Sequence, residues 1–295
     1  MVHLAGFPKA FLDDIIVHKT MPLLEWVRLA STLDVDGIEM YSVFFDGKGE
    51  GFEAEVRAAC EKAELEIPMM CFSPDFTQPD LAERKRELQR QMDAVDLTAR
   101  LGGQFCRTLS GQTRPGLDVD RTVGWCAEMI REGCAYAQTK GVTLVMENHY
   151  KDSYWTHHEF ALRSEVFLRI VAQVDSPAFG INYDPSNAVV AGEDPIALLR
   201  EVKGLVRSMH ASDRYLEGGS LEDLRKMALE PGAGYTTVLK HGIIGQGLND
   251  YDEIFSILQG AGFDGWVSIE DGMNGMEDLR ASVAFLRKKI AAYFG

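Results

Sequence analysis

Eight short β-rich runs alternate with longer amphipathic stretches along this chain. The predicted strands cover His3–Phe7, Gly37–Tyr41, Ile67–Phe72, Gln104–Leu109, Val142–Glu147, Phe179–Tyr183, Val206–His210 and Trp266–Glu270. Helical spacing of apolar residues predicts helices over Pro22–Leu33, Leu81–Leu101, Val123–Thr139, Ser164–Val174, Pro195–Val202 and Met276–Tyr293. This alternation is typical of βαβ units with a parallel sheet, and eight units close an α/β (β/α)8 TIM barrel. An open dinucleotide-binding sheet is disfavoured, because no GxGxxG follows the first strand.

One connection is longer than the others. It covers about residues 215–245, between the seventh and eighth predicted strands, and we expect it to hold a helix around Leu221–Ala228. No linker rich in Pro, Gly or Ser divides the chain, so residues 1–295 are expected to form a single barrel domain. Because loops at this end of a barrel lie over the catalytic face, we expect the long connection to select the substrate.

Charge and composition exclude several classes of protein. With 30 Lys and Arg against 45 Asp and Glu, the net charge is −15, which argues against a nucleic-acid partner. No apolar run of about 18 residues predicts a membrane span, and the N-terminal residues do not resemble a signal peptide. Five cysteines without CxxC spacing fit a reducing compartment. We therefore expect a cytoplasmic protein.

Potential metal ligands end four successive predicted strands. They are Glu147, Asp184, His210 and Glu270. The carboxyl ends of barrel strands ring one site, where three carboxylates would repel one another unless a cation lay between them. Oxygen donors with one imidazole suit Mn²⁺, Mg²⁺ or Co²⁺ better than a thiolate zinc site. The pattern predicts one divalent metal ion, with Mn²⁺ the first candidate. The alternative is that some acids pair with Arg107, Lys151 or Arg214.

Several sequence blocks carry a resemblance to a known family. The blocks VMENHY, NYDPSNAVVAGEDP, MHASDR and GIIGQGLNDYDEIFSILQGAGFDGWVSIED, with RTLSG at Arg107–Gly111, resemble the sugar phosphate isomerase/epimerase family with the xylose-isomerase-like TIM barrel. The resemblance implies a divalent metal held by the four strand-end residues. It also implies that Glu147 and Glu270 flank a keto-sugar and shuttle a proton. Keto-sugar 3-epimerases, dehydratases and 3-keto-glycoside lyases belong to this family.

The chain departs from the family pattern near two of these ligands. Asn187 stands where many relatives carry His, which weakens a link to the family's apurinic endonuclease branch with its three metals. His149 follows Glu147 by two residues and shares its strand face, so it is a candidate acid or base. Arg107, Asn187, Asp213 and His241 are predicted to contact substrate. Arg107 could instead pair with Glu39 or another acid, and Asp213 could orient His210 or face solvent.

The sequence leaves the reaction open between two kinds of chemistry. The first hypothesis is a metal-dependent isomerase or epimerase that removes a proton α to the carbonyl of a keto-sugar or related polyol. The alternative is a lyase or dehydratase that performs β-elimination on a 3-keto-glycoside or inosose-like substrate. A sugar-binding barrel without catalysis is disfavoured by the complete ligand set.

Other features bear on ligands and partners. No Gly-rich phosphate cradle is evident, so we expect an unphosphorylated sugar. His157 and His158 are expected to be exposed loop residues rather than a second metal site. The outer helices of a barrel could also support a homo-oligomer or association with a small partner subunit.

Overall fold

The computed structural model describes residues 1–152, 154–228, 237–270 and 273–295. Its main sheet is parallel, with strand order β2-β1-β11-β8-β7-β6-β5-β4-β3. The strands are β1 (His3–Gly6), β2 (Gly37–Ile38), β3 (Met40–Tyr41), β4 (Met69–Cys71), β5 (Phe105–Thr108), β6 (Thr143–Glu147), β7 (Phe179–Tyr183), β8 (Val206–Ala211) and β11 (Trp266–Ile269). The edge strands β2 and β3 are consecutive pieces of one extended segment, separated by Glu39. Because β2 pairs with β1 and β3 pairs with β4, the sheet closes into the predicted (β/α)8 barrel.

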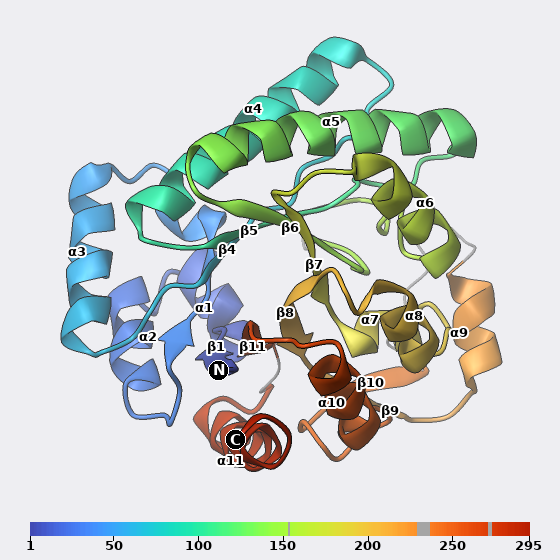
Figure 1. The fold of residues 1–295 in the computed structure, drawn as a ribbon. Coiled ribbons are helices and arrows are strands. Elements are labelled where there is room, and N and C mark those ends of the chain that lie inside the picture. The colour runs from blue at the N-terminus through green and yellow to red at the C-terminus, as the bar shows by residue number, and fades with distance from the viewer. Residues whose placement is uncertain (153, 229–236, 271–272) are drawn as a thin grey trace.

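Helices surround the strands on the outside of the barrel (Figure 1). They are α2 (Leu23–Ala30), α3 (Glu50–Lys62), α4 (Leu81–Arg100), α5 (Val119–Thr139), α6 (Ser164–Val174), α8 (Pro195–Val202), α10 (Tyr251–Gly260) and α11 (Met276–Phe294). Each turns an apolar stripe inward, as α2 does when it buries Trp26, Val27 and Ala30. Burial of a large apolar side chain contributes about 1.5–3 kcal/mol. The apolar contacts of these helices with the strands therefore stabilise the barrel.

The predicted strands and helices are found in the structure, although α5 begins at Val119 rather than at Val123. Four helices of the described residues were not predicted. They are α1 (Leu12–Ile16), α3, the short α7 (Pro185–Val190) and α10. α3 gives a weak periodic signal, because Val56 and Cys60 are its buried residues among many charged ones. α7 begins at Pro185, directly after β7, and this helix orients residues of the site described below.

The long connection contains a hairpin that the sequence did not reveal. β9 (Asp213–Leu216) pairs antiparallel with β10 (Leu239–Gly242). Between them lies the expected helix, α9 (Leu221–Met227), which is capped by Ser220. Residues 229–236 of this connection lie outside the described part of the chain. Because the two strands are far apart in sequence, no tight-turn motif between them predicts their pairing.

Two smaller expectations can also be compared with the structure. All five cysteines are buried and free, as small apolar residues would be. No helix within the described residues is long and apolar enough to cross a membrane.

Candidate metal centre and active site

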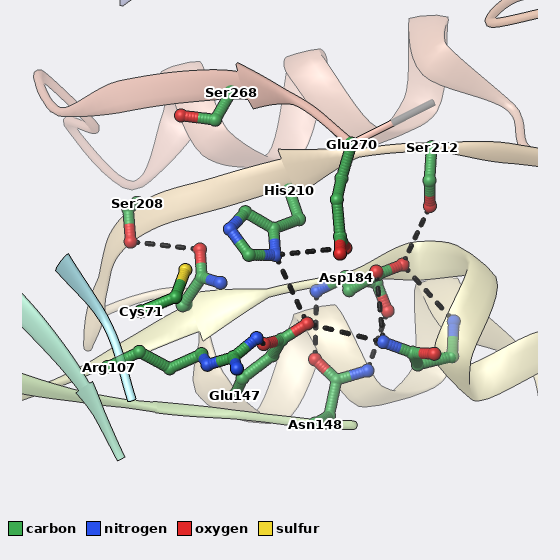
Figure 2. Close-up of polar contacts among 12 residues, drawn as sticks. Cys71, Arg107, Glu147, Asn148, Asp184, Ser208, His210, Ser212, Ser268 and Glu270 are labelled. Atoms are coloured by element: carbon green, nitrogen blue, oxygen red, sulfur yellow. Dashed lines mark hydrogen bonds and ion pairs between the residues drawn. The ribbon is translucent and has the colours of Figure 1, made fainter. Parts of the chain in front are cut away.

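Three carboxylates and one imidazole meet at the carboxyl ends of β6, β7, β8 and β11. The residues are Glu147, Asp184, His210 and Glu270, and one ligand atom from each lies within 4.8 Å of those of the others. His210 Nδ1 lies 3.1 Å from Glu147 Oε1 and 3.2 Å from Glu270 Oε2 (Figure 2). Glu147, Asp184 and His210 are buried, and Glu270 is 9% exposed. The structure therefore brings the four predicted ligand residues together.

Local backbone structure fixes Asp184. It caps α7, where its Oδ1 accepts hydrogen bonds from the backbone N–H groups of Ser186 and Asn187, at 2.8 and 3.1 Å. The Ser212 hydroxyl donates to the same oxygen at 2.9 Å (Figure 2). Asn148 bonds both the N–H and the C=O of Asp184 through its amide. The strand-to-helix turn thus holds this carboxylate with little freedom to move.

Asn187 ties two of the carboxylates to each other. Its Nδ2 donates to Asp184 Oδ2 at 2.9 Å and to Glu147 Oε1 at 3.3 Å. The side chain is 6% exposed, and it also lines the cavity above the cluster. Substrate contact by Asn187 stays a prediction, but the structure adds a clear role in orienting the ligand set.

The carboxylate of Glu39 contacts His210 on the opposite side of its ring from the ligand cluster. Glu39, between β2 and β3, places Oε2 2.9 Å from His210 Nε2, and it also accepts a hydrogen bond from the Ser268 hydroxyl. Both ring nitrogens thus face carboxylate oxygens, since Nε2 faces Glu39 and Nδ1 faces Glu147 and Glu270. A metal ion bound between the two glutamates would take the place of the proton on Nδ1. A carboxylate behind a ligating histidine fixes the ring and its tautomer. This geometry resolves the ambiguity of Glu39 in favour of a supporting role for His210.

Two cationic side chains each bind one carboxylate oxygen of Glu147 or Glu270, on the side away from His210. Arg107 donates from Nη1 to Glu147 Oε2 at 2.8 Å, and this ion pair is almost fully buried. The pairing is with Glu147 and not with Glu39. Lys9, which follows β1, lies 2.9 Å from Glu270 Oε1. Each glutamate therefore keeps its other oxygen directed toward His210.

The pKa shifts show how this charge is distributed. Burial alone would raise the pKa of Glu147, but His210, His149 and Arg107 lower it to about 2. For Asp184, burial and repulsion by Glu147 and Glu270 raise the pKa to about 7. Burial opposes protonation of His210, yet the carboxylates of Glu39, Glu147 and Glu270 raise its pKa well above the ordinary value. Negative charge is thus in excess around Asp184.

This donor set fits a divalent cation. Oxygen donors predominate in this set, and three carboxylates with one imidazole suit Mn²⁺, Mg²⁺ or Co²⁺ better than a thiolate zinc site would. A 2+ charge would also offset the repulsion by Glu147 and Glu270 that, together with burial, raises the pKa of Asp184. A second group that could hold an ion, formed by Glu39, Cys71 and His210, shares the imidazole of the first. Since Glu39 accepts from His210 and Ser268, we assign that group to the support of His210.

A cavity of about 410 Å³ opens above the cluster. Asp184 and Glu270 lie in its wall, together with His149 and His241 from the predicted set. His149 is buried, and its Nδ1 has no hydrogen-bond partner among the described residues. Burial, helped by Arg107 but opposed by Glu147, lowers the pKa of His149. The cavity therefore carries a buried imidazole beside two of the candidate ligands.

Two sequence expectations differ from what the structure shows. Asp213 accepts hydrogen bonds through both carboxylate oxygens from backbone N–H groups of residues 214, 245, 247 and 249, so it anchors a loop and neither orients His210 nor faces solvent. His158 is 5% exposed rather than an exposed loop residue, and its Nδ1 lies 3.1 Å from the Glu159 carbonyl oxygen. Among the described residues, neither His157 nor His158 belongs to a cluster able to hold a metal.

Sequence reasoning missed three residues of the site. Lys9 follows the first strand and could have been found by the same strand-end rule that gave the ligands. Asp152 lines the cavity from the loop after β6, and Arg214 lines it from β9. Arg214 was considered solely as a partner for an acid, and Asp152 carries no motif of its own.

Comparison with known proteins places this geometry in a family. The xylose isomerase-like TIM barrel model matches residues 27–289. An inosose dehydratase of Geobacillus thermodenitrificans is 25% identical over 137 residues, which cover 45% of this chain and 42% of that protein. The match thus spans less than half the length of that curated relative.

Solved structures show the same fold over almost the whole chain. A D-tagatose 3-epimerase-like protein superposes with a TM-score of 0.75 at 17% identity, covering 99% of this chain and 98% of its own. The IOLI protein, solved with a bound zinc atom, superposes with a TM-score of 0.73 at 16% identity and covers 99% of both chains. With its closed barrel and the match over residues 27–289, this chain belongs to the xylose isomerase-like TIM barrel family.

Proposed function

We propose that this protein is a divalent-metal-dependent isomerase or epimerase that moves a proton at the carbon next to the carbonyl of a keto-sugar. The observation that carries the proposal is the pair of glutamates, Glu147 and Glu270, on either side of His210 Nδ1. They come from β6 and β11, with β7 and β8 between them in the sheet. Glu270 lines the cavity, whereas Glu147 is fully buried and contacts His210 Nδ1 beside it. In the proposed complex the two carboxylates act on the sugar from different sides.

The metal would be held by Glu147, Asp184, His210 and Glu270, and we expect Mn²⁺ first. A bound divalent ion acts as a Lewis acid that polarises a carbonyl and so acidifies the neighbouring C–H bond. Glu39, Asn187 and Asn148 would keep the ligands in place, since each bonds a ligand residue directly.

The protein's own groups would carry the proton. One of Glu147 and Glu270 takes the proton from the carbon, and the other returns a proton on the opposite side, so that the configuration inverts without net loss of atoms. Arg107 and Lys9 each hold one oxygen of a glutamate, which leaves the other oxygen of Glu147 and of Glu270 directed toward His210. His149, buried in the cavity wall, is placed to exchange a proton with a sugar hydroxyl.

A second candidate reaction is β-elimination from a 3-keto-glycoside or inosose-like substrate. It is favoured by a further hollow that shares the lining residue Asp152 with the cavity. Such an extended cleft has room for a leaving group. In this reaction a base takes the α proton, the C–H electrons form a C=C bond, and the β C–O bond breaks. The leaving group departs with that electron pair and takes up a proton.

Deuterium exchange separates the two reactions. The Mn²⁺-loaded protein is incubated in D₂O with keto-sugars such as D-fructose, D-tagatose and a 3-keto-glucoside, and the products are followed by NMR. One deuterium at a single carbon of an intact sugar supports isomerisation or epimerisation. Release of the leaving group with a new enone supports elimination.

Variants test whether Glu147 and Glu270 carry out the deuterium exchange. Glu147→Gln and Glu270→Gln are expected to lower the exchange rate by roughly 100-fold or more, as removal of a general acid or base does. Glu159→Gln is a matched control, because Glu159 is also a buried glutamate but lies outside the cluster. Wild-type rates in both cluster variants would contradict the proposal.

A further inference from the structure

A second hollow, of about 460 Å³, adjoins the central cavity beside β3 and β4. Asp152 lines both hollows, so they share a wall. Aromatic side chains form much of the rest of the second hollow, including Tyr41, Phe72, Tyr154 and Trp155. We call this hollow the outer cavity. Each of the two volumes lies within the roughly 300–1,000 Å³ of small-ligand sites.

A chain of hydrogen bonds fixes the outer cavity relative to the candidate metal centre. Arg107 donates from Nη1 to Glu147 at 2.8 Å and from Nη2 to the Ser73 hydroxyl at 2.8 Å. The Ser73 hydroxyl donates to Asp152 Oδ2 at 2.6 Å, and the Tyr41 hydroxyl donates to the same oxygen at 2.9 Å. A ligand that spans both hollows would therefore meet a continuous, hydrogen-bonded wall.

The chemistry of the outer cavity suits an uncharged ring with many hydroxyl groups. Tyr154 is 58% exposed and Trp155 is 9% exposed, so the cavity offers one open and one buried aromatic ring. Carboxylates such as Asp46 accept hydrogen bonds from hydroxyl groups and repel phosphates or acids. Arg90, in the same wall, is paired with Glu87 Oε1 at 2.8 Å. A sugar ring has an apolar face for the aromatic rings and hydroxyl donors for the acids.

We infer that the outer cavity is a subsite for a second hydroxyl-rich ring, joined to the sugar in the central cavity, so that the natural substrate is a two-ring glycoside. The inference rests on the proposed function, since it assumes that the reacting sugar lies beside Glu147 and Glu270. It adds the substrate class and assigns Tyr154, Trp155 and Asp152 to its second ring.

Binding measurements on the full Mn²⁺-loaded chain test the subsite. Isothermal titration compares D-glucose and D-fructose with cellobiose, maltose, sucrose and lactose. We expect at least one disaccharide to bind tenfold or more tightly than either monosaccharide, and Tyr154→Ala to remove most of that gain. Because Tyr154 is largely exposed, this variant leaves the core intact. Tyr154→Phe keeps the ring and is expected to retain the gain.

Tyr215→Ala is the matched control. Tyr215 is 44% exposed and lines a different hollow, beside His241. Disaccharides that bind no more tightly than monosaccharides would overturn the inference, as would a gain that survives Tyr154→Ala or is lost in Tyr215→Ala. Metal-dependent deuterium exchange on a free keto-sugar that persists in either case would leave the proposed function intact.

Discussion

Glu159 is a fully buried carboxyl group outside the candidate metal centre, and its protonation makes a quantitative prediction. Its Oε1 accepts hydrogen bonds from the Ser110 hydroxyl and from the backbone N–H groups of Ser110 and Gly111, the latter two at 2.8 and 3.3 Å. Burial nevertheless raises the pKa of Glu159 from 4.5 to about 8, and the nearby Asp75 adds to the rise. The folded protein therefore holds this proton at neutral pH.

The sign and size of the effect follow from linkage. Because the pKa is higher in the folded state, the bound proton stabilises the fold fully below about pH 4.5, and this stabilisation is lost as the pH rises through about 8. At about 1.4 kcal/mol per pKa unit, the whole effect is ~5 kcal/mol. About 3 kcal/mol of it is lost between pH 5 and pH 8.

Urea unfolding of the wild-type protein and of Glu159→Gln, with a chelator present, measures this effect. We expect the wild type to lose ~3 kcal/mol of unfolding free energy relative to the variant between pH 5 and pH 8, since titrations common to both proteins cancel. Glu159 Oε2 has no hydrogen-bond partner among the described residues, so the amide can lower stability at every pH. The quantity that tests the prediction is the change of unfolding free energy with pH. Wild-type and Glu159→Gln curves of unfolding free energy against pH that run parallel would refute the reasoning.

Three further predictions follow from single contacts. Glu39→Gln removes the negative charge beside His210 Nε2, and it should weaken Mn²⁺ binding by about 10- to 100-fold in isothermal titration. An unchanged Mn²⁺ affinity would contradict the supporting role of Glu39. Asp213→Ala removes the acceptor for the backbone N–H groups of residues 245, 247 and 249, so those three amides should exchange hydrogen faster while the barrel strands stay protected. Trp26→Ala should cost about 3–5 kcal/mol in urea unfolding because Trp26 is fully buried, whereas Leu81→Ala, at a 53% exposed position, should change stability by less than about 0.5 kcal/mol.

The barrel could be predicted because its strands are short apolar runs that end in polar residues. The ligand residues were predicted for the same reason, since Glu147, Asp184 and Glu270 stand at or just beyond the ends of such runs. Glu39 was left ambiguous because it interrupts a strand, and only the closed barrel brings it to within 2.9 Å of His210 Nε2.

Contacts between distant segments could not be predicted from local patterns. The β9–β10 hairpin joins Leu216 to Leu239, with a helix between them. His158 looked like an exposed loop residue, but its segment pairs with residues after β5, where the N–H of Thr113 donates to the His158 carbonyl oxygen. Both pairings join segments that are far apart in the sequence, so no local pattern predicts them.

Equilibrium Mn²⁺ binding tests the central claim most directly. The electron paramagnetic resonance signal of free Mn²⁺ gives the number of bound ions and their affinity for the wild type, His210→Ala and Glu159→Gln. We predict one tightly bound Mn²⁺ per chain in the wild type and in Glu159→Gln, and an affinity lowered by roughly 100-fold or more in His210→Ala. Equal binding in His210→Ala and the wild type would contradict a metal centre built on Glu147, Asp184, His210 and Glu270.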